Sequence, residues 1–95
     1  MNPGIAAPSA ATVLTLPDML DLNAAAPLAA KFRVLRGRPV AVDASGVQKL
    51  GGLCLQVLLS ASVTWAVDNV PLRVVDASSA FREGAALFGA SPLTL

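Results

Sequence analysis

The sequence predicts a small α/β domain in which about three helices pack on a mixed, mostly parallel β-sheet. Strand-type and helix-type segments alternate along the 95 residues, as in parallel strands joined by right-handed crossovers. The segment Pro39–Asp43 is a nearly continuous apolar run, the pattern of a central strand covered on both faces. Hydrophobic residues make up 55% of the chain and aromatic residues only 4%, which favours one compact core built from small aliphatic side chains.

Two further strands flank this central one in the chain. Thr12–Leu16 alternates Thr with aliphatic residues, which suits a half-buried strand, and Pro17 ends it because proline cannot donate to a sheet ladder. Pro71–Val75 is the third expected strand. The domain is expected to comprise residues 12–95, preceded by a flexible tail of residues 1–11 that is rich in Ala, Pro, Gly and Ser.

The first expected helix, Leu22–Leu35, has Ala and Leu at helical spacing. Asn23 is the expected N-cap, although a regular helix could also begin at Pro27, where an early proline costs little. Gly37 marks its C-terminal end.

Two more helices are expected, over Leu53–Val67 and Ala80–Phe88. The pair Gly51-Gly52 opens the first of these through a tight turn that would suit a positive φ. Ser78 or Ser79 is expected to cap the last helix, and Gly89 to close it.

The composition argues against several classes of function. Histidine, the commonest general base and metal ligand, is missing, and no spacing of residues indicates a nucleophile–base pair. We therefore expect a protein that is not an enzyme and that holds no cofactor or metal.

The only cysteine, Cys54, cannot form an intrachain disulfide, which fits a reducing cytoplasm, and we expect it to be a small buried filler. Trp65 is expected to anchor the core or its edge.

The net charge of +1 argues against a nucleic-acid partner. Four basic residues do lie close together, but cations commonly gather at the C-terminal end of a helix, and we interpret the cluster in that way. The four residues are Lys31, Arg33, Arg36 and Arg38.

The most apolar window, Leu50–Val67, contains four polar residues and is flanked by Lys49 and Asp68. These features favour a buried helix over a membrane span, so no membrane insertion is expected. The first ten residues contain no Lys or Arg and no sustained apolar run, so no signal peptide is expected and the protein is assigned to the cytoplasm.

The stretch from Asp43 to Leu55 contains the pattern D-x-S-x-V-x-x-L followed by Leu55 and a run of Leu and Val. This pattern resembles the STAS family of anti-sigma-factor antagonists and related small docking domains. The segment LRVVDAS and the helix that follows it resemble the end of a typical member, so the likeness covers about Thr12–Ala90. Members usually carry a Ser or Thr in the loop before the second helix, and a partner kinase phosphorylates it. Here Gly51–Cys54 contains no hydroxyl.

The resemblance implies a non-catalytic interaction module that docks through the Asp43–Leu55 loop and the helix after it. By ungapped matching, Leu53 occupies the position of the lost phosphoacceptor, and a slip of two residues would place it at Gly51. Regulation by phosphorylation at this position is therefore not expected. The residues expected to dock the partner are Ser45, Gln48, Lys49, Gly51, Gly52, Leu53 and Gln56.

The partner class favoured by the short chain and the hydroxyl-free loop is a bacterial histidine kinase of the chemotaxis type. Three alternatives stay open: an anti-sigma-factor antagonist that regulates transcription through an anti-sigma kinase, the STAS subunit of a lipid-transport ABC system docking on its ATPase, and a structural homodimer. The anti-sigma kinase is disfavoured because the loop lacks Ser and Thr, and the transport subunit generally keeps a Thr there.

Overall fold

The structure, a computed structural model, describes residues 11–88 of the 95-residue chain. Three strands form the main sheet in the order β1-β3-β5, and both pairs of neighbours are parallel. The register places Val42 opposite Leu14 on one side and Val74 on the other. The predicted α/β class, with a mostly parallel sheet and three helices, is confirmed. The strands are β1 (Thr12–Thr15), β3 (Val40–Asp43) and β5 (Leu72–Val75).

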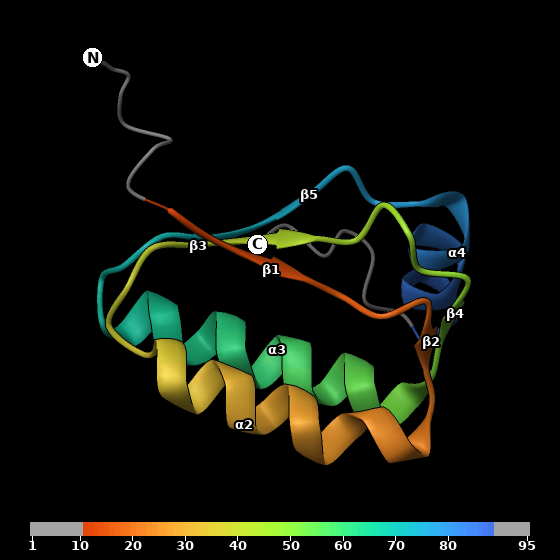
Figure 1. The fold of residues 1–95 in the computed structure, drawn as a ribbon, viewed down its shortest axis with the longest axis horizontal. Helices are drawn as coiled ribbons and strands as arrows, with labels where there is room; N and C mark the ends of the chain where they lie inside the picture. Colours follow the sequence, from red (N-terminus) through yellow and green to blue (C-terminus); the bar gives the residue numbers. More distant parts are fainter. Residues whose placement is uncertain (1–10, 89–95) are drawn as a thin grey trace.

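The two longer helices run side by side along one face of this sheet, while the third helix lies at one end (Figure 1). These helices are α2 (Ala25–Leu35), α3 (Gly52–Val67) and α4 (Ser79–Leu87). The core lies between the sheet and the first two helices, where each helix presents apolar residues at helical spacing. α2 buries Ala25, Leu28 and Phe32, and α3 buries Cys54, Leu55, Leu58, Ala61 and Trp65.

The two faces of the sheet differ in burial because successive side chains of a strand point to opposite faces. Leu14, Val42 and Leu72 belong to the core, whereas Val13 on the opposite face is 64% exposed and Ala41 is partly exposed. The expectation that the central strand is covered on both faces was therefore wrong: α2 and α3 lie on the same side.

The start of α2 differs from the predicted one. A short 3₁₀ turn, Leu22–Ala24, precedes the α-helix. Asp21, rather than Asn23, caps this 3₁₀ turn. The Asn23 backbone N–H donates to Asp21 Oδ1 at 3.0 Å. Pro27 lies in the first turn of α2, where its missing N–H leaves no helical bond unmade. Gly37 ends the helix with φ +88°, as predicted.

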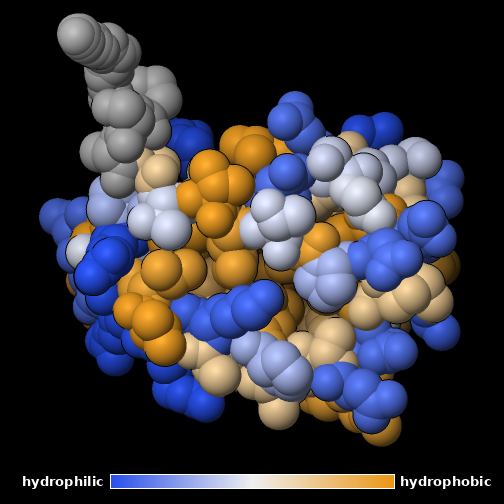
Figure 2. All heavy atoms as spheres, in the orientation of Figure 1, coloured by the Kyte–Doolittle hydropathy of each residue, from blue (hydrophilic) through white to orange (hydrophobic). Residues whose placement is uncertain are grey.

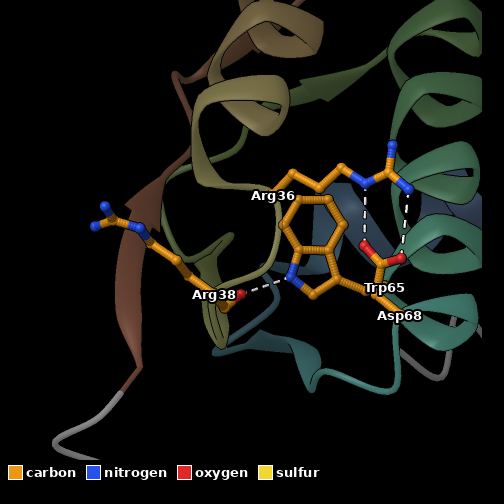
Figure 3. Close-up of polar contacts among 4 residues, drawn as sticks. All are labelled: Arg36, Arg38, Trp65 and Asp68. Atoms are coloured by element: carbon orange, nitrogen blue, oxygen red, sulfur yellow. Dashed lines mark hydrogen bonds and ion pairs between the residues drawn. The ribbon is translucent and has the colours of Figure 1, made fainter.

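Polar contacts join the C-terminal ends of α2 and α3 (Figure 3). The buried Trp65 indole Nε1 donates to the Arg38 carbonyl at 2.7 Å, and the Trp65 ring meets Phe32 edge-to-face at 5.7 Å between centroids. The Arg36 guanidinium donates to both carboxylate oxygens of Asp68, at 3.0 and 3.3 Å. Trp65 is thus a core anchor as predicted, whereas Arg36 has a specific partner in place of general helix-end solvation.

A second, two-stranded parallel sheet was not predicted. It pairs β2 (Met19–Leu20) with β4 (Lys49–Leu50), and α4 packs against β4. Two residues cannot show a periodic pattern, so the sequence gives no strand signal at either place. The predicted end of the last helix at Gly89 and residues 1–10 of the expected tail lie outside the described residues.

On the side shown in Figure 2, hydrophobic residues gather in the middle of the surface, between the strands and α2, and hydrophilic ones surround them. A hollow of about 160 Å³ lies here, lined by Leu14, Leu28 and Lys31 among others. Lys31 therefore lies on the side of α2 that faces β1.

Within residues 11–88 no helix combines the length and the apolar character needed to cross a membrane.

The cap of α4 gives a test of the fold. Ser78 Oγ accepts from the Phe81 backbone N–H at 3.0 Å and donates to the Val47 carbonyl at 2.6 Å, while the adjacent Ser79 is exposed. We expect Ser78→Ala to lower the free energy of unfolding by about 1–3 kcal/mol, because a cap and a partly buried hydrogen bond are both lost. Ser79→Ala is the matched control and should change it by less than about 0.5 kcal/mol. Urea unfolding followed by circular dichroism measures both, and equal effects would contradict this assignment.

Candidate functional site

The candidate site begins where β3 ends, in the loop that leads to α3. The Ser45 backbone N–H donates to Asp43 Oδ1 at 2.9 Å, which closes a tight Asx-type turn. This backbone bond, followed by a contact with the Ser45 hydroxyl, lowers the pKa of the Asp43 carboxyl below its usual value. The side chain of Ser45 itself is exposed.

The middle of the loop is held to the body of the domain. Ala44 and Val47 are buried, and the Ala44 carbonyl accepts from the Ser78 backbone N–H at 3.1 Å. The Val47 carbonyl accepts from Ser78 Oγ. A loop with buried side chains and satisfied backbone groups is positioned rather than mobile, so its exposed side chains occupy defined places.

Two exposed side chains of the predicted docking set follow at the start of β4 (Lys49–Leu50): Gln48 lies just before the strand and Lys49 is its first residue. The backbone N–H groups of Gln48 and Lys49 both donate to the Asp18 carbonyl, at 2.7 and 3.1 Å. Their side chains point into solvent, so the backbone is fixed while the side chains stay available.

The two glycines at the start of α3 lie in close contacts and do not adopt a positive φ. Gly51 has φ −86° and ψ 160°, and positive φ is confined to Gly37, Asn69 and Asp76 among the described residues. A Cβ on Gly51 would lie 2.9 Å from the Leu20 carbonyl oxygen, and one on Gly52 would lie 3.2 Å from the Phe88 ring. The suggestion of a positive φ at this turn was therefore wrong.

The first turns of α3 form a ridge between two hollows. Leu53, 47% exposed, and the exposed Gln56 line both of them. One hollow, of about 460 Å³, extends toward Leu59 and Phe88. The other, of about 400 Å³, lies between α2 and α3. The structure thus brings Gly52, Leu53 and Gln56 together, whereas Ser45, Gln48 and Lys49 line neither hollow.

The outer surface of α3 adds residues that sequence reasoning missed. The 16 residues of this helix include no charged side chain, yet only one side of it is buried. Such a helix would normally be covered all round. On the exposed side lie Leu59 at 37%, Val63 at 63% and Val67 at 77% exposure, alternating with Gln56 and Ser60. We call this set, with Leu53, the outer face of α3.

Cys54 lies just inside the helix but is fully buried, and its thiol contacts the Asp21 carbonyl oxygen at 3.3 Å. Burial, and next the neighbouring charge of Asp21, raises the pKa of the thiol. A buried thiol with a raised pKa is inert, and the prediction of a small core filler is confirmed.

The chemistry that the described residues could support is limited. No group of three or more His, Cys, Asp or Glu side chains in this part of the chain could hold a metal ion. What α3 does present is a surface of apolar and uncharged polar groups, and the loop beside it adds the exposed side chains of Ser45, Gln48 and Lys49. Such a surface is typical of the central part of a protein–protein interface.

Comparison with protein families shows the family to which the chain belongs. Residues 4–94 match the family described as Mlab, STAS domain, so the chain belongs to the STAS domain family. The family assignment expected from the D-x-S-x-V-x-x-L pattern is confirmed, and with it a general role as a regulatory or interaction module. No curated protein and no solved structure matches the chain.

The close contact at Gly51 can be tested with two glycines. In Gly51→Ala the new Cβ meets the Leu20 carbonyl oxygen, a backbone atom that cannot rotate away, and we expect a loss of about 1–3 kcal/mol in the free energy of unfolding. In the control Gly46→Ala the Cβ meets nothing within 4 Å, so stability should stay the same or rise by up to about 1 kcal/mol. Thermal unfolding of both variants provides the measurement. A neutral Gly51→Ala would show that the contact is not limiting.

Proposed function

We propose that this chain is a non-catalytic docking module that binds a bacterial signalling partner in the cytoplasm, in the first place a histidine kinase of the chemotaxis type. The interface consists of the Asp43–Leu55 loop and the outer face of α3. The observation that carries the proposal is the outer face of α3 itself, an exposed helix surface without a single charge.

The physical reason is the cost of leaving such a surface in water. Fully burying one Val or Leu side chain is worth about 1.5–3 kcal/mol, and contiguous exposed apolar surface of this kind commonly marks a protein contact. Val63 and Val67 expose most of their surface, and Leu53 and Leu59 extend the same stripe toward the loop. Gln56 and Ser60 can satisfy a partner's polar groups without the desolvation cost of an ion.

The same surface supports the proposal that the loop carries no phosphorylation switch. An added phosphate acts by bringing charge and bulk to an interface. Leu53, at the matched position of the phosphoacceptor, offers an exposed apolar side chain there instead. We propose that docking is constitutive at this site and that any regulation lies with the partner.

The test compares the binding of purified kinase to immobilised chain variants. Leu53→Glu places an unpaired charge in the centre of the interface, so the affinity should fall at least about tenfold. Val34→Glu is the matched control, because Val34 is 78% exposed on α2 and lines neither hollow. It should bind like the wild type, and circular dichroism should show both variants folded.

Equal binding by both variants would overturn the proposed interface. A kinase that fails to bind the wild-type chain would overturn the proposed partner. In that case, Leu53-dependent binding of an anti-sigma kinase or an ABC ATPase would assign the same surface to one of those classes.

A further inference from the structure

We propose that the hollow between α2 and α3 receives an amphipathic helix of the docking partner whose polar side carries acidic residues. This inference rests on the proposed function and deepens it, because it assigns the chemistry of the partner segment. The juxtaposition that supports it is an apolar groove with two arginines on one wall and no carboxylate among its lining residues.

The groove is lined by residues of α2 and α3. These two helices pack side by side (Figure 1). The floor of the groove is apolar, formed by Phe32, Ala61 and Trp65, whose side chains also belong to the core. Along α3 it extends from Leu53 to Thr64, which at 1.5 Å per residue is about 16 Å, or three helical turns. A groove of this length and character suits a helix that presents apolar anchors at positions i, i+3 or i+4, and i+7.

The positive charges of Arg33 and Arg36 on the wall of the groove favour a partner segment with negative charge. Arg33, in the last turn of α2, is exposed, and the ion pairs within residues 11–88 do not include it. Arg36 donates to Asp68 but keeps 61% of its side chain exposed. The polar residues that α3 contributes to the lining, Gln56, Ser60 and Thr64, are all uncharged. A partner carboxylate would find a guanidinium fork here, the geometry that favours paired hydrogen bonds.

The same charges argue against a second copy of this chain in the groove. A two-fold interface brings the same patch of both copies together. Arg33 and Arg36 of one copy would then face the same groove of the other copy, which has no carboxylate among its lining residues. The nearby Asp68 already accepts hydrogen bonds from Arg36 of its own chain. Charge complementarity therefore favours a different, acidic chain.

The experiment measures the affinity of the purified kinase for two charge-reversal variants of α2 at physiological ionic strength, where the screening length is about 8 Å. Arg33→Glu replaces an attraction by a repulsion in the groove, and we expect at least a tenfold loss of affinity. Lys31→Glu makes the same change of charge on the side of α2 that faces β1, and should cost less than threefold.

A second measurement identifies the bound segment. With a photo-reactive benzoylphenylalanine at position 60, cross-linking and mass spectrometry should capture one helical segment of the kinase that bears acidic residues. Capture of a segment without acidic residues would overturn the inference. So would a dimer of the chain alone, in sedimentation analysis, that dissociates in Arg33→Glu.

The failures of the two proposals are distinguishable. If Leu53→Glu abolishes binding while Arg33→Glu behaves like Lys31→Glu, the docking function stands and the acidic segment is overturned. If the wild-type chain does not bind the kinase at all, the proposed function fails and the inference falls with it.

Discussion

The close approach of Gly51 to β2 is the constraint on which the rest of the candidate site depends. The Gly51 backbone N–H donates to the Leu20 carbonyl at 2.8 Å, and a Cβ at the same residue would stand 2.9 Å from that oxygen. A Cβ on Gly84 would stand equally close, at 2.9 Å, to the Leu50 side chain, and a Cβ on Gly52 would lie 3.2 Å from the Phe88 ring. Three positions without side chains thus let β2, β4 and the end of α4 pack closely near the first turn of α3.

This packing links the fold to the proposed mode of action. A residue with a hydroxyl carries a Cβ, so the space at Gly51 cannot hold one without displacing backbone. The tight start of α3 therefore conflicts with a phosphorylatable residue at that position, and Leu53 presents an apolar surface nearby. From there the uncharged outer face of α3 continues for the length of the helix, with the Arg33 wall of the groove beside it. The proposed mode of recognition, an uncharged ridge next to a basic wall, depends on the way in which α3 is held.

The sequence predicted those features that depend on local chemistry. The three main strands, the three helices and the turn at Gly37 follow from apolar runs, caps and glycine, and the structure confirms them. It could not predict the pairing of β2 with β4, because two residues have no period. The sequence predicts a cap at Asn23, whereas Asp21 caps the 3₁₀ turn that precedes α2; both residue types cap equally well, and only the path of the entering chain decides between them. The reason for Gly51-Gly52 depends on residues some thirty positions away. The exposed residues of the outer face of α3 could not be predicted, because a helix without charged residues has no polar side that would indicate its orientation.

The most direct test of the central claim, that the partner covers the outer face of α3, is methyl NMR of the Leu- and Val-labelled chain with a soluble paramagnetic agent. The free chain should show strong relaxation at Val63, Val67 and also at Val13, whose side chain is exposed on the open face of the sheet. On adding the kinase, we expect the α3 methyl groups to become protected while Val13 keeps its relaxation. Protection of Val13 with Val63 and Val67 unchanged would place the partner on the sheet and contradict the account.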